Sequence, residues 1–279
     1  MVENQLRYKI FSRVPILAYH KIDRNFEWGV TRVTPSQFAM QMDFLYRNNY
    51  KIVTLSELLN QEAKGKIVSI TFDDAYKDFL HYGFPVMKKY GFTATVFVIT
   101  KFVGKENLWD INIGYRKFSH MDWQDLQKLI ENGFEIGSHT HSHPDLRKLD
   151  KKKLTEELLL SREILEDRLK IKVKFLSYPF GRYSERIKKM VQDCGYLGAV
   201  CLSHPFRKKG NIYEIDRESI YTFDTIFDFG AKLMRHGKTF LYFEKVKTRA
   251  VNFFAGATYP LKQVEHFFSK NLKNNAKRK

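Results

Sequence analysis

The side chains best suited to chemistry follow apolar runs of the sequence. Asp73 and Asp74 come directly after one such run, and His139 and His143 come shortly after another. Two adjacent carboxylates at the end of a buried strand repel each other unless a cation or an arginine compensates them. One carboxylate with two imidazoles suits Zn²⁺ or a similar divalent ion and leaves positions open for water and substrate. The pattern therefore predicts a metal site, with a second carboxylate beside it that can act as a base.

Each of these residues also has an ordinary structural interpretation. Adjacent aspartates often cap helices. Two histidines four residues apart share a face only if they lie on a helical turn, and His141 between them is a competing ligand. His20 follows a third apolar run, but one histidine alone is more often a hydrogen-bonded core residue than a catalyst. Arg217 would by default form a surface ion pair. The prediction depends on their occurring together.

The elements that must position these residues alternate along the chain. Short apolar runs predict strands at 14–19, 52–54, 67–72, 93–99, 134–138, 173–177, 197–201 and 211–215. Helical patterns cover 35–48, a short segment from Ser56, 79–90, 122–132 and 151–170. Such alternation indicates an α/β fold with parallel strands, whose carboxyl ends meet at one face in a barrel. We predict a distorted (β/α) barrel of about seven parallel strands, with catalytic residues from five strand ends gathered at one mouth.

The charge of the chain is concentrated near its end. The 279 residues carry a formal charge of +17, and residues 231–279 hold 12 Lys and Arg against Glu244 and Glu265, a net of +10. Phenylalanines and tyrosines are interleaved with these lysines. We therefore predict one catalytic domain over residues 1–230 and a basic, aromatic, helical extension over 231–279. The extension suits packing on the body, contact with an anionic membrane or, less well, binding of nucleic acid, for which no motif is present.

Three motifs, in this order, resemble a known family. TFDD at 71–74, HTHSH at 139–143 followed by Pro144, and YPFG at 178–181 are similar to the first three motifs of the polysaccharide deacetylases. These proteins are also called the NodB-homology group, or carbohydrate esterase family 4. The resemblance covers about residues 20–220. AYHKI at 18–22 is similar to the branch that contains the poly-N-acetylglucosamine deacetylases, where a histidine near the start of the chain supplies a role placed near the C-terminus in other members.

The resemblance implies a role for each residue that matches a motif. Asp73 would be the general base, and His20 the general acid. Asp74, His139 and His143 would hold one divalent metal ion, with zinc expected and cobalt or nickel as alternatives. The residues that would bind substrate are Tyr178, Pro179, Phe180 and Gly181, which would line the acetyl pocket with the Phe180 N–H at the oxyanion, and Trp109, a candidate platform for stacking a sugar or else a core residue.

The sequence departs from the family pattern at one position. Many members have an arginine two residues before the proline of the third motif, where it pairs with the catalytic aspartate. Ser177 occupies that position here. We expect Arg217, arriving from a neighbouring strand end, to take over the pairing with Asp73.

These observations predict a metal-dependent hydrolase that removes N-acetyl groups from a glycan containing N-acetylglucosamine or from a lipid-linked sugar. An O-acetyl esterase or a deacylase of a small amide would use the same residues. A non-catalytic protein that binds carbohydrate or a membrane surface is a third alternative, but binding alone needs no base beside a metal.

The expected location follows from what the sequence lacks. We see no signal peptide and no apolar run of about 20 residues that could span a bilayer. We therefore expect a cytoplasmic protein, peripheral to the inner membrane face if the basic extension contacts anionic lipid. Cys194 and Cys201 are the only cysteines, and we expect both to be free thiols.

Overall fold

The computed structural model describes residues 2–24, 31–59, 65–107, 118–203 and 210–234. The strands are β1 (Ile16–Tyr19), β2 (Lys21–Ile22), β3 (Arg32–Val33), β4 (Lys51–Ile52), β5 (Ile67–Phe72), β6 (Thr95–Val98), β7 (Glu135–Ser138), β8 (Phe175–Ser177), β9 (Gly198–Leu202) and β10 (Ile215–Ser219). The helices are α1 (Val2–Arg13), α2 (Pro35–Arg47), α3 (Leu55–Leu59), α4 (Asp78–Tyr82), α5 (Phe84–Tyr90), α6 (Trp123–Glu131), α7 (Lys151–Leu169), α8 (Glu185–Asp193) and α9 (Ile226–Met234).

Seven of the strands close into a barrel. They run in the order β1-β10-β9-β8-β7-β6-β5, and β5 pairs with β1 to complete the ring, while β4 pairs with the first two residues of β5, Ile67 and Val68. Every pairing in this sheet is parallel, and the closing pair β1 and β5 is in register from Ile16–Ser69 to Tyr19–Phe72. The predicted barrel of about seven parallel strands is therefore confirmed. Because all its strands are parallel, their carboxyl ends open at one mouth.

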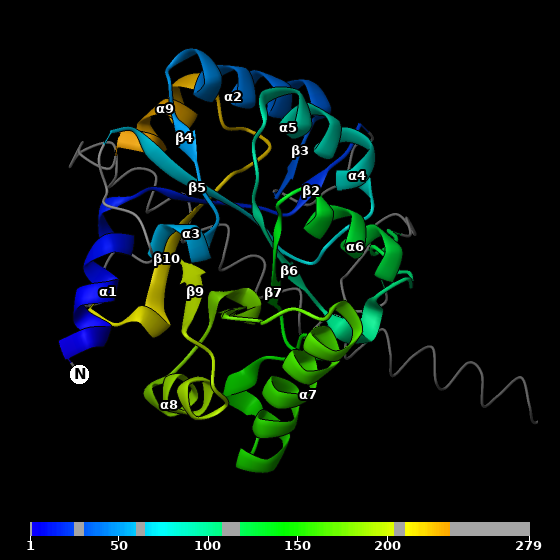
Figure 1. Cartoon of the computed structure of the whole chain (residues 1–279), viewed down its shortest axis with the longest axis vertical. Coiled ribbons are helices and arrows are strands. Elements are labelled where there is room, and N and C mark those ends of the chain that lie inside the picture. Colours follow the sequence, from blue (N-terminus) through cyan, green and yellow to red (C-terminus); the bar gives the residue numbers. More distant parts are fainter. Residues whose placement is uncertain (1, 25–30, 60–64, 108–117, 204–209, 235–279) are drawn as a thin grey trace, which may run out of the picture.

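The helices cover the outside of the barrel and leave the strands buried on both faces. Figure 1 shows α2, α5 and α9 grouped on one side of the strands and α7 and α8 on the opposite side. The α2 helix illustrates how the sequence sets such an element. Thr34 and Gln37 form a capping box at its start, and Phe38, Met42 and Leu45, spaced three and four residues apart, are buried.

The α1 helix, which the sequence analysis did not predict, packs against the end of the barrel opposite the mouth. Phe11 is buried, and its ring meets the ring of Phe175, the first residue of β8, edge-on with centroids 5.8 Å apart. This contact ties the N-terminal helix to the base of the barrel. It depends on a partner more than 160 positions away in the chain, which no local pattern signals.

Two other predicted elements differ from the structure. The helix expected over 79–90 is split at Gly83 into α4 and α5. The last strand was expected at 211–215, but residues Ile212–Glu214 form a 3₁₀ turn and the strand is β10. Asp216 and Arg217 therefore lie within a strand and not after one. The predicted division at residue 230 falls inside α9, and residues after 234 lie outside the described part of the chain.

One glycine makes room for an aromatic ring inside the barrel. A Cβ atom added at Gly137 in β7 would lie 2.5 Å from the Phe97 ring and 3.1 Å from the Phe175 carbonyl oxygen. Such distances are too short for a real side chain, so the glycine lets Phe97 occupy the space beside β7. The guanidinium of Arg217 lies 5.4 Å from the centroid of that ring.

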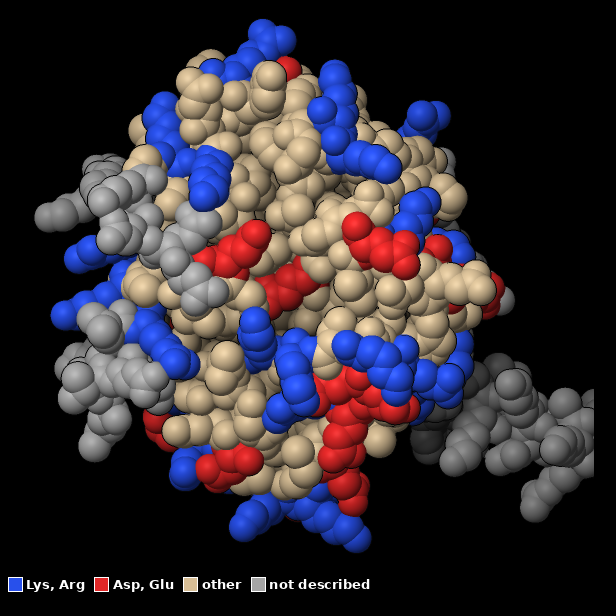
Figure 2. Space-filling view, in the orientation of Figure 1, with Lys and Arg blue, Asp and Glu red and all other residues tan. Residues whose placement is uncertain are grey.

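The surface shown in Figure 2 has mixed charge. Lys and Arg side chains are spread around this face and interleaved with Asp and Glu, so its coloured part presents no continuous basic patch. Within the described residues, no helix is long and apolar enough to cross a membrane. Cys194 and Cys201 are both buried, free thiols.

Candidate catalytic and metal site

Three potential metal ligands converge at the mouth of the barrel. Asp74 follows β5 and His139 follows β7, and His143 lies four residues further on. Their donor atoms all lie within 4.8 Å of one another, and all three residues are buried. Nε2 of His139 is 3.4 Å from Oδ1 of Asp74, and Nε2 of His143 is 4.0 Å from the same oxygen. The structure thus brings together the three residues that the sequence suggested as ligands.

The two histidines meet through a loop and not through the helical turn that their spacing would also allow. Thr140 and His143 have positive φ angles of 68° and 59°, so the chain doubles back and the two rings approach to 4.7 Å between centroids. The backbone N–H of His143 donates to the Thr140 hydroxyl, 3.1 Å away. Glu157 of α7 accepts hydrogen bonds from the backbone N–H and the hydroxyl of Ser142, at 2.8 and 2.5 Å. The loop is therefore held by a hydrogen bond within it and by the bonds that Ser142 donates to Glu157 of α7.

The donor set fits a divalent metal ion. Nδ1 of His139 lies 2.8 Å from the Ser177 carbonyl oxygen, which can only accept, so the proton is on Nδ1. The lone pair of Nε2, on the side of Asp74, is then available to a metal ion. Burial lowers the pKa of His139 and lowers that of His143 further, with the neighbouring His139 adding to the effect there. Both rings are therefore neutral at neutral pH, as metal ligation requires.

His141, the competing ligand in the motif, points elsewhere. Its Nδ1 lies 2.9 Å from the Thr100 hydroxyl, and the residue is partly exposed. The Asp74, His139 and His143 group does not include it.

Asp73 is held by Arg217. The Nη1 and Nη2 atoms of the guanidinium each donate to one carboxylate oxygen of Asp73, both at 2.7 Å. Ser177 joins the pair, because its hydroxyl donates to Oδ2 of Asp73 at 3.2 Å and accepts from Nη2 of Arg217 at 2.9 Å. Thr71 accepts a further bond from Nη1 at 3.0 Å. Arg217 therefore has the partner expected from the sequence, although it reaches Asp73 from within β10.

The arginine determines the charge of Asp73. Burial alone would raise the pKa of this carboxyl, but the Arg217 guanidinium, together with His139 and His20, outweighs burial and holds the pKa well below its usual range. Arg217 is fully buried, and Asp73 is 3% exposed. A bidentate pair of this kind keeps the carboxylate ionised over the whole working pH range of a protein.

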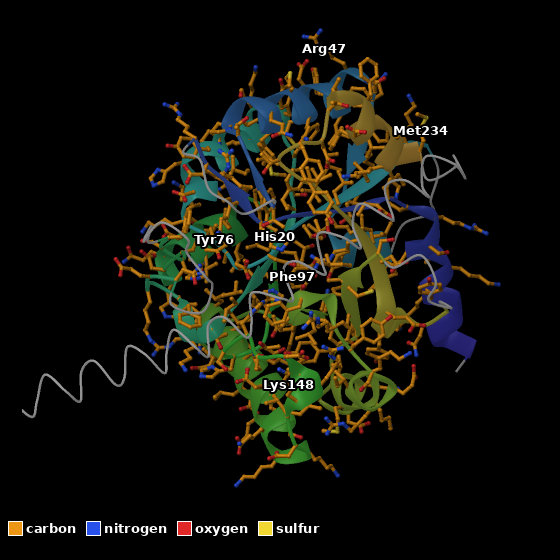
Figure 3. All side chains as sticks on the ribbon, turned by 180° about the vertical axis from the view of Figure 1, so that it is seen from behind. His20, Arg47, Tyr76, Phe97, Lys148 and Met234 are labelled. Carbon is orange, nitrogen blue, oxygen red and sulfur yellow. The ribbon has the colours of Figure 1, made fainter. Side chains whose placement is uncertain are left out.

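His20 lies beside this pair. Its Nε2 is 3.9 Å from Oδ2 of Asp73, and 19% of its side chain remains exposed. In Figure 3, His20 is labelled near the middle of the view. Burial lowers the pKa of His20 to about 4, although the Asp73 charge acts in the opposite direction. The ring is therefore neutral at neutral pH in the metal-free protein.

The lowered pKa of His20 predicts a dependence of stability on pH. Because the folded pKa lies below the ordinary value of 6.5, the unfolded chain binds the proton more tightly, and stability is lost as pH falls from about 6.5 to about 4. The His20→Asn variant should lose about 3 kcal/mol less than the wild type between pH 7 and pH 4. Urea denaturation of both metal-free proteins at the two pH values measures this difference. Equal losses would contradict it.

The YPFG segment is divided between the core and the site. The Tyr178 side chain is buried in the core, and its hydroxyl donates to the Tyr213 carbonyl oxygen at 2.9 Å. Pro179 is also buried. The ring of Phe180 meets the His143 ring with centroids 4.7 Å apart. Gly181 has a φ of 64°, and a Cβ there would lie within 3.0 Å of Leu202.

Trp109 lies outside the described residues. His120, which the sequence analysis did not single out, lies within hydrogen-bonding distance of the metal-ligand segment, with Nδ1 2.7 Å from the Asp74 carbonyl oxygen. Nothing in the sequence around His120 signals this contact, because it joins residues 46 positions apart.

The comparison with known proteins agrees with this geometry. The profile of the family described as polysaccharide deacetylase matches residues 60–199, which is half of the chain. This chain belongs to the polysaccharide deacetylase family. The matched segment includes Asp73, Asp74, His139 and His143, so the ligand cluster and its neighbouring carboxylate are the family's part of the molecule.

Individual relatives give the same family. YxkH of Bacillus subtilis (strain 168), described as a polysaccharide deacetylase, is 32% identical over 190 residues, covering 66% of this chain and 63% of that protein. The poly-beta-1,6-N-acetyl-D-glucosamine N-deacetylase of Staphylococcus aureus (strain MRSA252) is 30% identical over 176 residues, 58% of each chain. The match thus spans about three-fifths of the length of these two relatives.

Solved structures confirm the fold of this polysaccharide deacetylase family member. The deacetylase PplD of Streptococcus pyogenes, determined in complex with acetate, superposes with a TM-score of 0.69 at 23% identity, covering 79% of this chain and 97% of that one. At this identity the likeness concerns the fold alone.

Proposed function

We propose that this member of the polysaccharide deacetylase family is a metal-dependent hydrolase that removes N-acetyl groups from a glycan containing N-acetylglucosamine. The observation that carries the proposal is the position of the Asp73–Arg217 pair directly beside the buried Asp74, His139 and His143 group. An ionised base next to a set of neutral imidazoles suits hydrolysis, whereas simple binding needs no base. The Staphylococcus aureus relative, named as a poly-N-acetylglucosamine N-deacetylase, supports the choice of substrate.

Asp74, His139 and His143 are the residues that would hold the metal ion. When bound there, a divalent ion such as zinc, cobalt or nickel supplies a Lewis acid that polarises the amide carbonyl and acidifies water.

Asp73 is suited to the role of general base. Arg217 and Ser177 fix both carboxylate oxygens, so the carboxylate cannot turn away from its neighbours. Its lowered pKa means that it is ionised before water arrives and can accept a proton as the nucleophile forms. A geometrically fixed base avoids the cost of orienting the group in the transition state.

His20 is placed to act as the general acid. An amine is a poor leaving group unless it is protonated, so the reaction needs a proton donor as well as a base. With a pKa of about 4, the His20 ring is neutral and has to gain a proton during the reaction before it can give one to the amine. Asp73 lies 3.9 Å away, so the proton that Asp73 removes from water has a short route to His20.

The proposed substrate contacts are those of the third motif and of Trp109. Phe180, whose ring lies against His143, is the residue of this motif best placed to meet an acetyl group. A role for Trp109 in stacking a sugar stays a prediction. Contact of residues 231–279 with an anionic membrane, and a location at its inner face, stay predictions as well.

Acetate release from oligomers of N-acetylglucosamine tests the proposed function. The zinc-loaded protein should release acetate, a chelator should abolish the release, and added zinc should restore it. Release that continues unchanged after the metal is removed would contradict metal dependence. A protein that binds zinc but releases no acetate from any oligomer would contradict the proposed substrate. A protein with neither property would support the non-catalytic alternative.

A further inference from the structure

His120 is a buried histidine with no role in the chemistry described so far. It is 2% exposed and lies just before α6. Its Nδ1 is 2.7 Å from the backbone carbonyl oxygen of Asp74, one of the three potential metal ligands. Because a carbonyl oxygen can only accept, Nδ1 of His120 must carry the proton of this hydrogen bond.

The backbone that His120 contacts is strained. Asp74 and Ala75 have φ angles of 70° and 51°, two consecutive left-handed residues, neither of which is glycine. Non-glycine residues held in this region are strained and persist only where the surroundings determine the conformation. Without such restraint the turn after β5 would relax, and the Asp74 carboxylate would change direction.

The segment 119–121 supplies the restraint. Lys77 donates a backbone hydrogen bond to the Ser119 carbonyl, and Met121 donates one to the Ala75 carbonyl, both at 2.8 Å. The side chain of His120, between these two backbone bonds, secures the carbonyl of Asp74. This side-chain contact acts on the potential ligand residue itself.

The His120 ring is in turn held in place. It stacks on the Tyr76 ring, with centroids 4.9 Å apart and planes at 22°, and on the Phe102 ring, at 5.6 Å and 28°. Its backbone N–H donates to the Lys105 carbonyl at 2.9 Å. Tyr76, labelled in Figure 3, follows the strained turn directly, so the same short segment carries the ligand and part of the support for the ring.

We propose that His120 is a positioning residue for the metal site, whose Nδ1–H fixes the Asp74 carbonyl and thereby aims the Asp74 carboxylate at His139 and His143. The inference rests on the metal site proposed above. Hydrogen-bond partners that orient metal ligands typically change metal affinity 10–100-fold when they are lost.

Two variants separate the hydrogen bond from the packing of the ring. His120→Leu removes the donor and keeps an apolar side chain, whereas the Nδ2 of His120→Asn lies close to the place of Nδ1 and keeps the donor. Zinc affinity is measured for wild type and both variants by competition with a chromophoric chelator, together with thermal unfolding of the metal-free proteins. We expect zinc binding about 10–100-fold weaker in His120→Leu and within about threefold of wild type in His120→Asn.

The outcomes distinguish the inference from the proposal on which it rests. Wild-type affinity in His120→Leu, or equally weak binding in both variants, would overturn the positioning role. Lower metal-free stability in both variants with unchanged zinc affinity would show a packing role alone and overturn it too. A wild-type protein that binds no zinc would instead overturn the metal site itself.

A second measurement covers the case in which His120→Leu fails to fold. In long-range ¹⁵N–¹H spectra of the wild-type protein, the His120 proton should be found on Nδ1. A ring protonated on Nε2 alone cannot donate to the Asp74 carbonyl and would overturn the inference.

Discussion

Arg217→Met should lower the free energy of unfolding by about 3–5 kcal/mol, as is typical when one partner of a buried ion pair is removed. Arg217 is fully buried, and its guanidinium makes four hydrogen bonds, to Thr71, Ser177 and both oxygens of Asp73. Methionine fills much of the same volume but leaves the buried Asp73 carboxylate uncompensated. Urea denaturation at pH 7 measures the loss.

A double-mutant cycle tests whether the ion pair is the cause. In an Asp73→Asn background the buried negative charge is already gone. The double variant should therefore lose much less free energy of unfolding than the sum of the losses in the two single variants. Additive losses would show that Arg217 stabilises the protein through packing, for example against the Phe97 ring, and not through Asp73.

His143→Ala should weaken zinc binding on the order of a hundredfold or more, because zinc sites gain about 10–16 kcal/mol from about four ligands. His143 is one of three buried residues whose donors lie within 4.8 Å of one another. Isothermal titration or competition with a chelator gives the affinity.

The same motif provides the matched control. His141 lies two positions away but contacts the Thr100 hydroxyl. His141→Ala should therefore bind zinc within about threefold of wild type. Equal losses in the two variants, or a larger loss in His141→Ala, would contradict the proposed ligand set.

The sequence was most informative where buried strands lead into polar residues. The bounds of β5 were predicted without error, because six apolar or small residues in a row precede the aspartates. The place of β10 was not. Its sequence, IDRES, lacks an apolar run, and it is a strand because parallel partners on both sides fix its backbone and because Asp73 compensates the buried Arg217.

In the site, too, local sequence was informative for some features, whereas others depend on contacts across the fold. The spacing of His139 and His143 indicated a pair that the structure does bring together, but through a loop with positive φ angles at Thr140 and His143 and not through a helical turn. Local spacing does not reveal such a loop, because Glu157 of α7 helps to hold it. His120 could not be found from the sequence at all, because its proposed role depends on contact with Asp74 across the fold.

Acetate release by Asp73→Asn, compared with wild type at equal zinc content, tests the central claim most directly. Asparagine keeps the size of the side chain and leaves the metal ligands unchanged, but it cannot accept the proton of the attacking water. The account predicts that kcat falls about 10²–10⁴-fold while zinc stays bound, as is typical for loss of a general base. Acetate release at the wild-type rate from zinc-loaded Asp73→Asn would contradict the account.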